Sequence, residues 1–232
     1  RRRTVLVCGL PVPVRGGSLG LLLGVLNVGG DGVELLLGWT IAAYIPTIPP
    51  PVLLLGGEQG SAKSTTTRTI VSVADPSPAP VRAQPKDVES WLVAASGSWV
   101  VGIDNVSAIT TWFSDCLCRA ATGAGLVRRK LFTDSEIAVV AIRRAIILNS
   151  IDIGALRGDL GDRIVIVDLE PIPPDKRRSE ADLDAVLNRD RPRVFGALLD
   201  VLAAVRQELP NVQLREHPRM ADFARVLAAM DL

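Results

Sequence analysis

The stretch Val52-Leu-Leu-Leu-Gly-Gly-Glu-Gln-Gly-Ser-Ala-Lys-Ser-Thr-Thr66 is the part of the sequence that says most about the fold. Its first four residues are apolar and have the length of a buried strand, and the glycines that follow predict a sharp loop before a helix. Strand, glycine-rich loop, Lys-Ser and helix is the layout of a phosphate-binding P-loop. Glycines let the backbone curl so that successive N–H groups face a triphosphate, and the positive end of the next helix adds to that field. The stretch therefore predicts a site for a nucleoside triphosphate.

Individual residues of this loop have separate expected roles. The amine of Lys63 is expected to reach the β- and γ-phosphates, and the hydroxyl of Ser64 to bind Mg²⁺. Ala62 stands where the pattern G-x-x-x-x-G-K-[ST] usually continues with glycine before the lysine. We expect little effect, because alanine is small and tolerates helical dihedrals. The alternative to the whole motif is a chance glycine-rich turn. We expect ATP to contact the full loop: Gly57, Glu58, Gln59, Gly60, Ser61, Ala62, Lys63, Ser64 and Thr65.

Composition narrows the classes of function. The chain has 232 residues and a formal net charge of +1, so any surface for nucleic acid must be local. Three cysteines and a single histidine, His217, argue against a disulfide framework, a histidine zinc site and a Ser-His-Asp triad. Charged residues and prolines interrupt the apolar region 19–55 before it reaches the length of a membrane span. We therefore expect a cytoplasmic protein outside the membrane. The chain starts at Arg1 without a methionine, which suggests a piece of a longer protein.

Two further apolar runs end on polar side chains. Residues 98–104 predict a buried strand that ends at Asp104, and residues 143–150 predict one with Asn149 at its tip. Asp104 is expected to hold Mg²⁺ through water, opposite Ser64. Asn149 is expected to hold the attacking water near the γ-phosphate. The plainer alternatives are an exposed carboxylate at a strand end and a turn-forming asparagine.

The residue after Asp104 bears on the rate of hydrolysis. Asn105 follows where many ATPases of this type place a glutamate that polarises the attacking water. An asparagine side chain can position a water but cannot accept its proton. Either hydrolysis is slow or another acid serves, such as Glu58 or Asp115.

Three arginines are candidates for contacts with phosphate. Arg163 precedes the apolar run 164–169 and is expected to reach a neighbouring subunit's γ-phosphate, with Arg157 as the weaker candidate. The alternative for both is a salt bridge to Asp159 or Asp162. Arg219 opens the last expected helix and is a candidate for contact with the nucleotide, although a surface arginine fits that position nearly as well.

The order of these elements predicts an α/β fold: a P-loop parallel sheet flanked by helices, with a helical lid at the carboxyl end. We expect a mostly helical lead-in over residues 1–48, a nucleotide-binding core over 49–172 and the lid over 173–232. A short strand is expected at 4–7 and a proline-rich connector at 76–85. Helices are expected at 19–28, 31–45, 63–73, 87–95, 110–121, 180–188, 193–209 and 220–231.

This succession of motifs resembles an AAA+ ATPase over residues 50–232. Ala62-Lys63-Ser64 is similar to the minichromosome-maintenance helicases, where alanine also precedes the lysine. Residues 117–125 followed by Arg128-Arg-Lys-Leu-Phe-Thr-Asp134 resemble superfamily III helicases and phage or plasmid primase-helicases. The chain is also similar to ATP-binding proteins of actinobacterial phages and integrated elements.

The resemblance implies a ring, expected to be a hexamer, with ATP at the subunit interfaces and single-stranded DNA in the pore. Basic side chains between Asp104 and Asn149 would then contact DNA phosphates. The candidates are Arg128, Arg129, Lys130, Arg143 and Arg144, and a solvated charge cluster is the alternative for each.

Three hypotheses compete. The first is a DNA-translocating ATPase that serves as a replicative helicase of a phage or mobile element. The second is a nucleotide-dependent loader or switch with weak ATPase activity, which Asn105 and the near-neutral charge favour. The third is a scaffold with a degenerate site, which the combination of Lys63, Ser64 and Asp104 opposes.

Overall fold

The computed structural model describes residues 8–129, 137–152 and 154–231. Its centre is a five-stranded parallel sheet with the strand order β2-β3-β6-β1-β7. The strands are β1 (Val52–Gly56), β2 (Val81–Ala83), β3 (Val100–Asp104), β6 (Ala145–Asn149) and β7 (Ile164–Asp168). The expected parallel α/β fold is confirmed. The strand expected at 4–7 lies outside the described residues.

The strand β2 was missed by sequence reasoning, which assigned 76–85 to a connector. It is only three residues long and pairs with β3 alone, at the edge of the sheet. Proline is tolerated at an edge because one side of the strand needs no partner. The prolines around β2 therefore favoured a loop on sequence grounds, whereas pairing with β3 makes the segment a strand.

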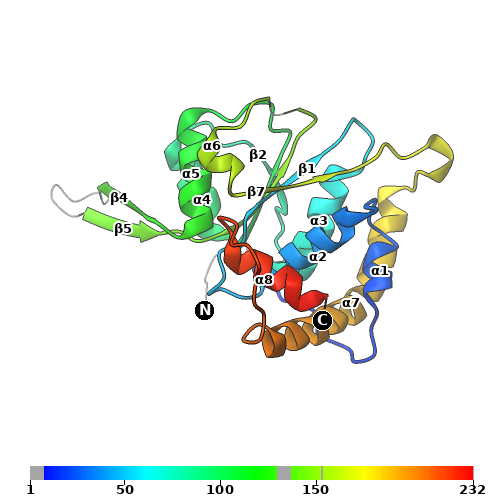
Figure 1. Cartoon of the computed structure of the whole chain (residues 1–232). Coiled ribbons are helices and arrows are strands. Elements are labelled where there is room, and N and C mark those ends of the chain that lie inside the picture. The colour runs from blue at the N-terminus through cyan, green and yellow to red at the C-terminus, as the bar shows by residue number, and fades with distance from the viewer. Residues whose placement is uncertain (1–7, 130–136, 153, 232) are drawn as a thin grey trace.

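Helices cover both faces of the sheet (Figure 1). One face packs on α4 (Val88–Gly97), α5 (Thr111–Thr122) and the short α6 (Gly158–Gly161) through a buried cluster that includes Trp91 and Phe113. The other face packs on α2 (Asp31–Ala43) and α3 (Lys63–Ala74). Beyond them lie α1 (Leu19–Leu23), α7 (Glu180–Glu208) and α8 (Ala221–Met230). The sheet therefore lies between two layers of helices, and further helices cover the layer of α2 and α3.

The first and last helices of the chain share one hydrophobic core. Trp39 of α2, Val194 of α7 and Phe223 of α8 belong to the same buried cluster as Leu53 and Leu55 of the central strand. The helices of the expected lead-in therefore pack with the helices of the expected lid. The division at 48 and 173 stays a prediction, and the packing shows that its outer parts are not independent of each other.

Two helix boundaries differ from expectation. The first helix ends at Leu23, with Gly24 as its cap, rather than near Val28. The two helices expected at 180–188 and 193–209 are one continuous helix, α7, with Pro192 inside it. Proline removes the N–H that the carbonyl of Asn188 would accept. Asn188 is exposed, so its carbonyl can turn to solvent and the helix continues.

A two-stranded hairpin interrupts the chain between α5 and β6. Strand β4 (Gly125–Arg129) pairs antiparallel with β5 (Ile137–Ala141). The hairpin projects from the body of the molecule (Figure 1). Among the described residues, no helix is both long and apolar enough to cross a membrane.

Candidate functional site

The carboxyl ends of β1, β3 and β6 meet at one edge of the sheet. Because β6 lies between β1 and β3, Asn149 stands beside Leu55 of β1 and Asp104 lies one strand further. These ends open into a cleft of about 560 Å³. The cleft is lined by loop residues 59–65 and by Arg68, Asp104, Asn105, Asn149, Ser150, Ile151 and Glu180. Its size suits a small-molecule ligand. Three separate sequence motifs thus share one cleft.

Two glycines are required by the loop's backbone. Gly57 has φ of 130° and Gly60 has φ of 82°, which L side chains rarely adopt. A Cβ atom at Gly57 would also lie 2.3 Å from the carbonyl oxygen of Leu169. Glycine is therefore demanded at this position by both conformation and space.

Ala62 is strained, contrary to the expectation that it would adopt helical dihedrals. It has φ of 66° and ψ of 28°, the left-handed region, at the amino end of α3. A non-glycine residue pays about 1 kcal/mol for this conformation because Cβ approaches the following carbonyl. The backbone at position 62 has the left-handed conformation that glycine adopts most easily, and contacts with the rest of the protein hold alanine in that conformation.

The loop is braced from outside by backbone and side-chain donors. Ile172 N donates to Gly60 O at 3.2 Å, and Asn27 Nδ2 donates to Ser61 O at 3.1 Å and to Glu170 O at 2.6 Å. A trans peptide holds its C=O and N–H on opposite sides. With the Gly60 and Ser61 carbonyls turned toward the brace, the N–H groups of Ser61 and Ala62 point away from it, and both residues line the cleft. Successive backbone N–H groups are donors of the kind that bind anions.

Asn27 was missed by sequence reasoning, which placed it in a helix over 19–28. The available signal was a single polar residue in an otherwise apolar run. Its role depends on partners that lie 34 and 143 residues away along the chain.

Lys63 lies across the loop. Its Nζ donates to the carbonyls of Gly57 at 2.7 Å and Glu58 at 2.8 Å. Burial lowers the pKa of Lys63, and the nearby carboxylate of Asp104 acts in the opposite direction. An anion in the cleft would supply the charge stabilisation that burial removes from this ammonium group.

A chain of hydrogen bonds joins the three motifs. Ser64 Oγ donates to Asp104 Oδ2 at 2.8 Å, and Asn149 Nδ2 donates to Asp104 Oδ1 at 2.9 Å. Thr67 Oγ1 donates to Asn149 Oδ1 at 2.7 Å, which fixes the orientation of the buried amide. Sequence reasoning had no signal for Thr67, because its partner is 82 residues away.

The donor set fits Mg²⁺. A hydroxyl and a carboxylate are hard oxygen ligands, and Mg²⁺ is usually held by one or two protein groups together with phosphates and waters. Ser64 and Asp104 lie within hydrogen-bonding distance of each other at the mouth of the loop. In the part of the chain that the structure describes, no group of three or more histidine, cysteine or acidic side chains forms an alternative metal cluster.

The candidate water-activating acids do not meet at the site. Asn105 lines the cleft, with φ of 54°, as a residue that can orient a water. Neither Glu58 nor Asp115 is among the residues that line the cleft. Asp115, on α5, pairs with Arg157 at 3.4 Å. Neither acid considered from the sequence therefore replaces a glutamate beside Asp104, and the other acid that lines the cleft, Glu180, is paired with Arg68.

The candidate arginines lie at the opposite end of the sheet. Arg163 precedes β7 and its carbonyl accepts from Val52 N, at the start of β1. The length of β1, roughly 15 Å, therefore separates Arg163 from the glycine-rich loop. Arg163 bonds to Asp159, and its side chain is only 13% exposed. Arg219 pairs with Asp159 at 3.0 Å and Asp162 at 3.7 Å. The structure does not bring Arg163 or Arg219 to the cleft of its own chain.

Two arginines proposed for DNA contact have structural partners instead. Arg143 donates to Pro46 O at 3.0 Å and to Thr122 O at 3.3 Å, and Arg144 donates to Ala95 O. These bonds hold the base of the hairpin to the body of the protein. Arg128 and Arg129 lie on β4, and Lys130 lies outside the described residues.

Solved structures support the fold. The chain matches the apo C-terminal region of NrS-1 with a TM-score of 0.57 and 12% identity, over 94% of this chain and 53% of that one. It thus spans about half the length of the NrS-1 region. The JCV helicase matches with a TM-score of 0.40 and 13% identity, over 86% of this chain and 59% of that one, a likeness too loose to carry an argument.

Comparison of the sequence with protein families gives a match. The chain matches no curated protein. A family model does match it, over residues 19–232. The chain belongs to the family of actinomycete integrative conjugative element replication proteins.

Proposed function

We propose that this chain is an ATP-binding and ATP-hydrolysing motor subunit, of the AAA+ type, that acts on DNA during replication of an integrative conjugative element. One observation carries the proposal: Lys63 and Ser64 of α3, Asp104 of β3 and Asn149 of β6 line a single cleft beside the glycine-rich loop. Membership in a family of replication proteins supplies the biological setting.

Each residue has a defined task in such a reaction. The N–H groups of the loop and the ammonium of Lys63 would bind the β- and γ-phosphates and stabilise the charge that builds up as the terminal phosphoryl group leaves. Ser64 and Asp104 would hold Mg²⁺, which neutralises charge on the β- and γ-oxygens. Asn149, with its amide oriented by Thr67, would position the attacking water.

Slow hydrolysis follows from Asn105. A general base contributes typically 10²- to 10⁴-fold to a rate, and an amide cannot accept the proton. This observation favours the second candidate, a loader or switch that assembles with ATP and resets slowly. In a ring, Arg163 or Arg219 would act only on a neighbouring subunit's nucleotide, after release from Asp159.

The projecting hairpin supports contact with DNA. Its first strand carries Arg128 and Arg129, and it interrupts the chain between the strands that bear Asp104 and Asn149. Strand β5 ends only a few residues before β6, so a movement of β6 on hydrolysis would be transmitted to the hairpin. Phosphate contacts from such a hairpin would be independent of sequence and sensitive to salt.

The test measures ATP turnover by the full-length protein with and without single-stranded DNA, together with the mass of the assembly with and without nucleotide. A motor predicts nucleotide-dependent assembly and turnover that DNA raises. Assembly with slow turnover that DNA does not change would favour the loader or switch. ATP binding that is unchanged by Lys63→Ala would exclude every function based on the P-loop.

A further inference from the structure

The cleft contains an ion pair that the proposed reaction does not use. Arg68, on α3 one turn after Ser64, places Nη2 2.7 Å from Oε1 of Glu180, the first residue of α7. Both side chains line the cleft together with Thr65. An acid at this place needs an explanation, because a carboxylate alone would repel a triphosphate.

The position of the pair indicates which part of a nucleotide it would meet. Asp104 and Asn149 approach the cleft from β3 and β6, on one side of β1. Glu180 follows β7, on the other side of β1, and the start of α7 stands beside α1 and α3 (Figure 1). In the proposed function the γ-phosphate lies at Asp104, since Mg²⁺ bridges the β- and γ-oxygens there. The opposite end, at Arg68 and Glu180, is then left for the α-phosphate and the sugar.

The chemistry of the pair matches that end of the ligand. The hydrogen bond from Arg68 holds the pKa of Glu180 below its ordinary value, so the carboxylate stays ionised and only accepts hydrogen bonds. Arg68 engages Oε1, and a carboxylate has several further acceptor positions. Sugar hydroxyls are donors that a carboxylate recognises in other nucleotide sites. Arg68 meanwhile cancels the repulsion between the carboxylate and the phosphates.

Resting on the proposed function, we propose that Glu180 binds the ribose hydroxyls while Arg68 bridges Glu180 and the α-phosphate, so that the site selects ribonucleoside triphosphates over 2′-deoxyribonucleoside triphosphates. The arrangement also makes the position of α7 sensitive to the sugar. Glu180 is the first helical residue after the cap Ser179, so a ligand that holds Glu180 holds the start of the helix.

The test compares the dissociation constants of ATP and 2′-dATP, each with Mg²⁺, by calorimetric titration of the full chain. The wild type is expected to bind ATP about fivefold more tightly, the effect of one hydroxyl bonded to a charged but solvent-exposed acceptor. Glu180→Ala is expected to remove this preference. Glu180→Gln keeps the length of the side chain and one acceptor oxygen, so this variant is expected to retain part of the preference for ATP.

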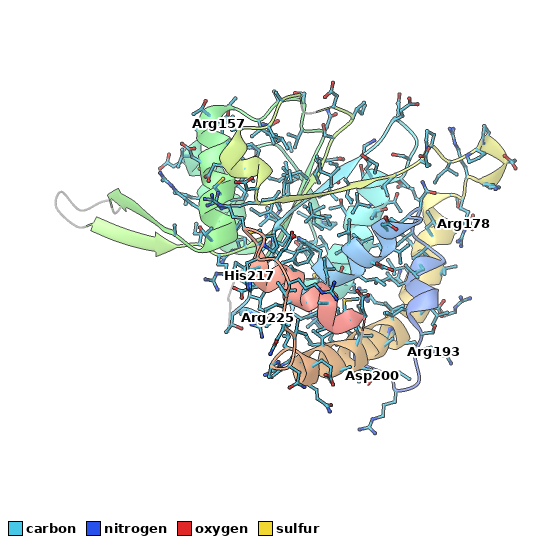
Figure 2. All side chains as sticks on the ribbon, in the orientation of Figure 1. Arg157, Arg178, Arg193, Asp200, His217 and Arg225 are labelled. Atoms are coloured by element: carbon cyan, nitrogen blue, oxygen red, sulfur yellow. The ribbon has the colours of Figure 1, made fainter. Side chains whose placement is uncertain are left out.

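A matched control lies on the same helix. Asp200 is exposed on α7, away from the cleft (Figure 2), and Asp200→Ala is expected to leave the preference intact. Equal binding of ATP and 2′-dATP by the wild type, or a preference that survives Glu180→Ala, would overturn the inference while leaving the proposed function standing. Binding of neither nucleotide by the wild type would instead overturn the proposed function.

Discussion

The two ends of the central sheet use their polar side chains differently. At the carboxyl end, Lys63, Ser64, Asp104 and Asn149 converge on an open cleft. At the amino end of β7, Arg163 and Arg219 converge on Asp159, and Arg219 also lies near Asp162, so both cations are paired within the chain. Figure 2 shows two labelled arginines far apart, Arg157 at the α6 end and Arg178 near the start of α7. A basic residue that the sequence suggests for a phosphate contact can instead be held by an acid of its own chain, as Arg163 and Arg219 are.

Lys63→Ala is the substitution with the largest expected effect on the carboxyl end. It removes the ammonium that lies across the loop, and we expect ATP turnover to fall by at least ~100-fold. Steady-state phosphate release measures it. Lys86→Ala, in an exposed loop, is the matched control and should turn over ATP as the wild type does.

Asn27→Asp tests whether the outer brace matters to the cleft. The substitution replaces a donor by an acceptor against the carbonyls of Ser61 and Glu170, so we expect binding of ATP to weaken by about tenfold. The dissociation constant of Mg²⁺-ATP measures it. Asn188→Asp, exposed on α7, should bind normally. Equal affinities for the two variants would mean that the loop holds its shape without the brace.

Ala62→Gly tests whether the left-handed conformation of Ala62 lowers the stability of the protein. Glycine adopts the left-handed conformation freely, and part of the gain is lost to the greater freedom of glycine in the unfolded chain. We expect the free energy of unfolding to rise by about 0.5 kcal/mol, measured by urea titration. A destabilised variant would show that the methyl group of Ala62 packs usefully in the loop.

Arg163→Ala tests the amino end and has the smallest expected effect. The hydrogen bond from Arg163 lowers the pKa of Asp159, so the pair stabilises the fold above the ordinary pKa of aspartate and loses this contribution as pH falls through the lowered one. The variant should therefore raise the pKa of Asp159 and flatten the loss of stability below about pH 4. Carbon NMR titration of the Asp159 carboxyl group measures the shift. An unchanged pKa would mean that Arg219 alone accounts for it.

Much of the carboxyl end was predictable because the geometry of a parallel sheet is simple. Residues at the ends of parallel strands meet at one edge, so Asp104 and Asn149 could be placed near the P-loop from the apolar runs before them. Asn27 and Thr67 could not, because each acts through partners far away in sequence. The short edge strand β2 and the continuity of α7 through Pro192 were missed for a related reason: neighbouring elements outweigh local proline signals.

Sequence patterns alone were enough for the class of fold, for the glycine-rich loop after the first strand of the sheet and for the residues at the strand tips, since strand periodicity and glycine placement are local properties of the chain. The pairing of Arg163 with Asp159, four residues away, was one of the alternatives that the sequence offered. The three-dimensional structure was needed to show that Arg219 also pairs with Asp159, that Ala62 is strained, and that Arg68 and Glu180 stand in the cleft. The partners of Arg219 and Arg68 lie 60 and 112 residues away along the chain, and pairing at that distance leaves no local pattern to read.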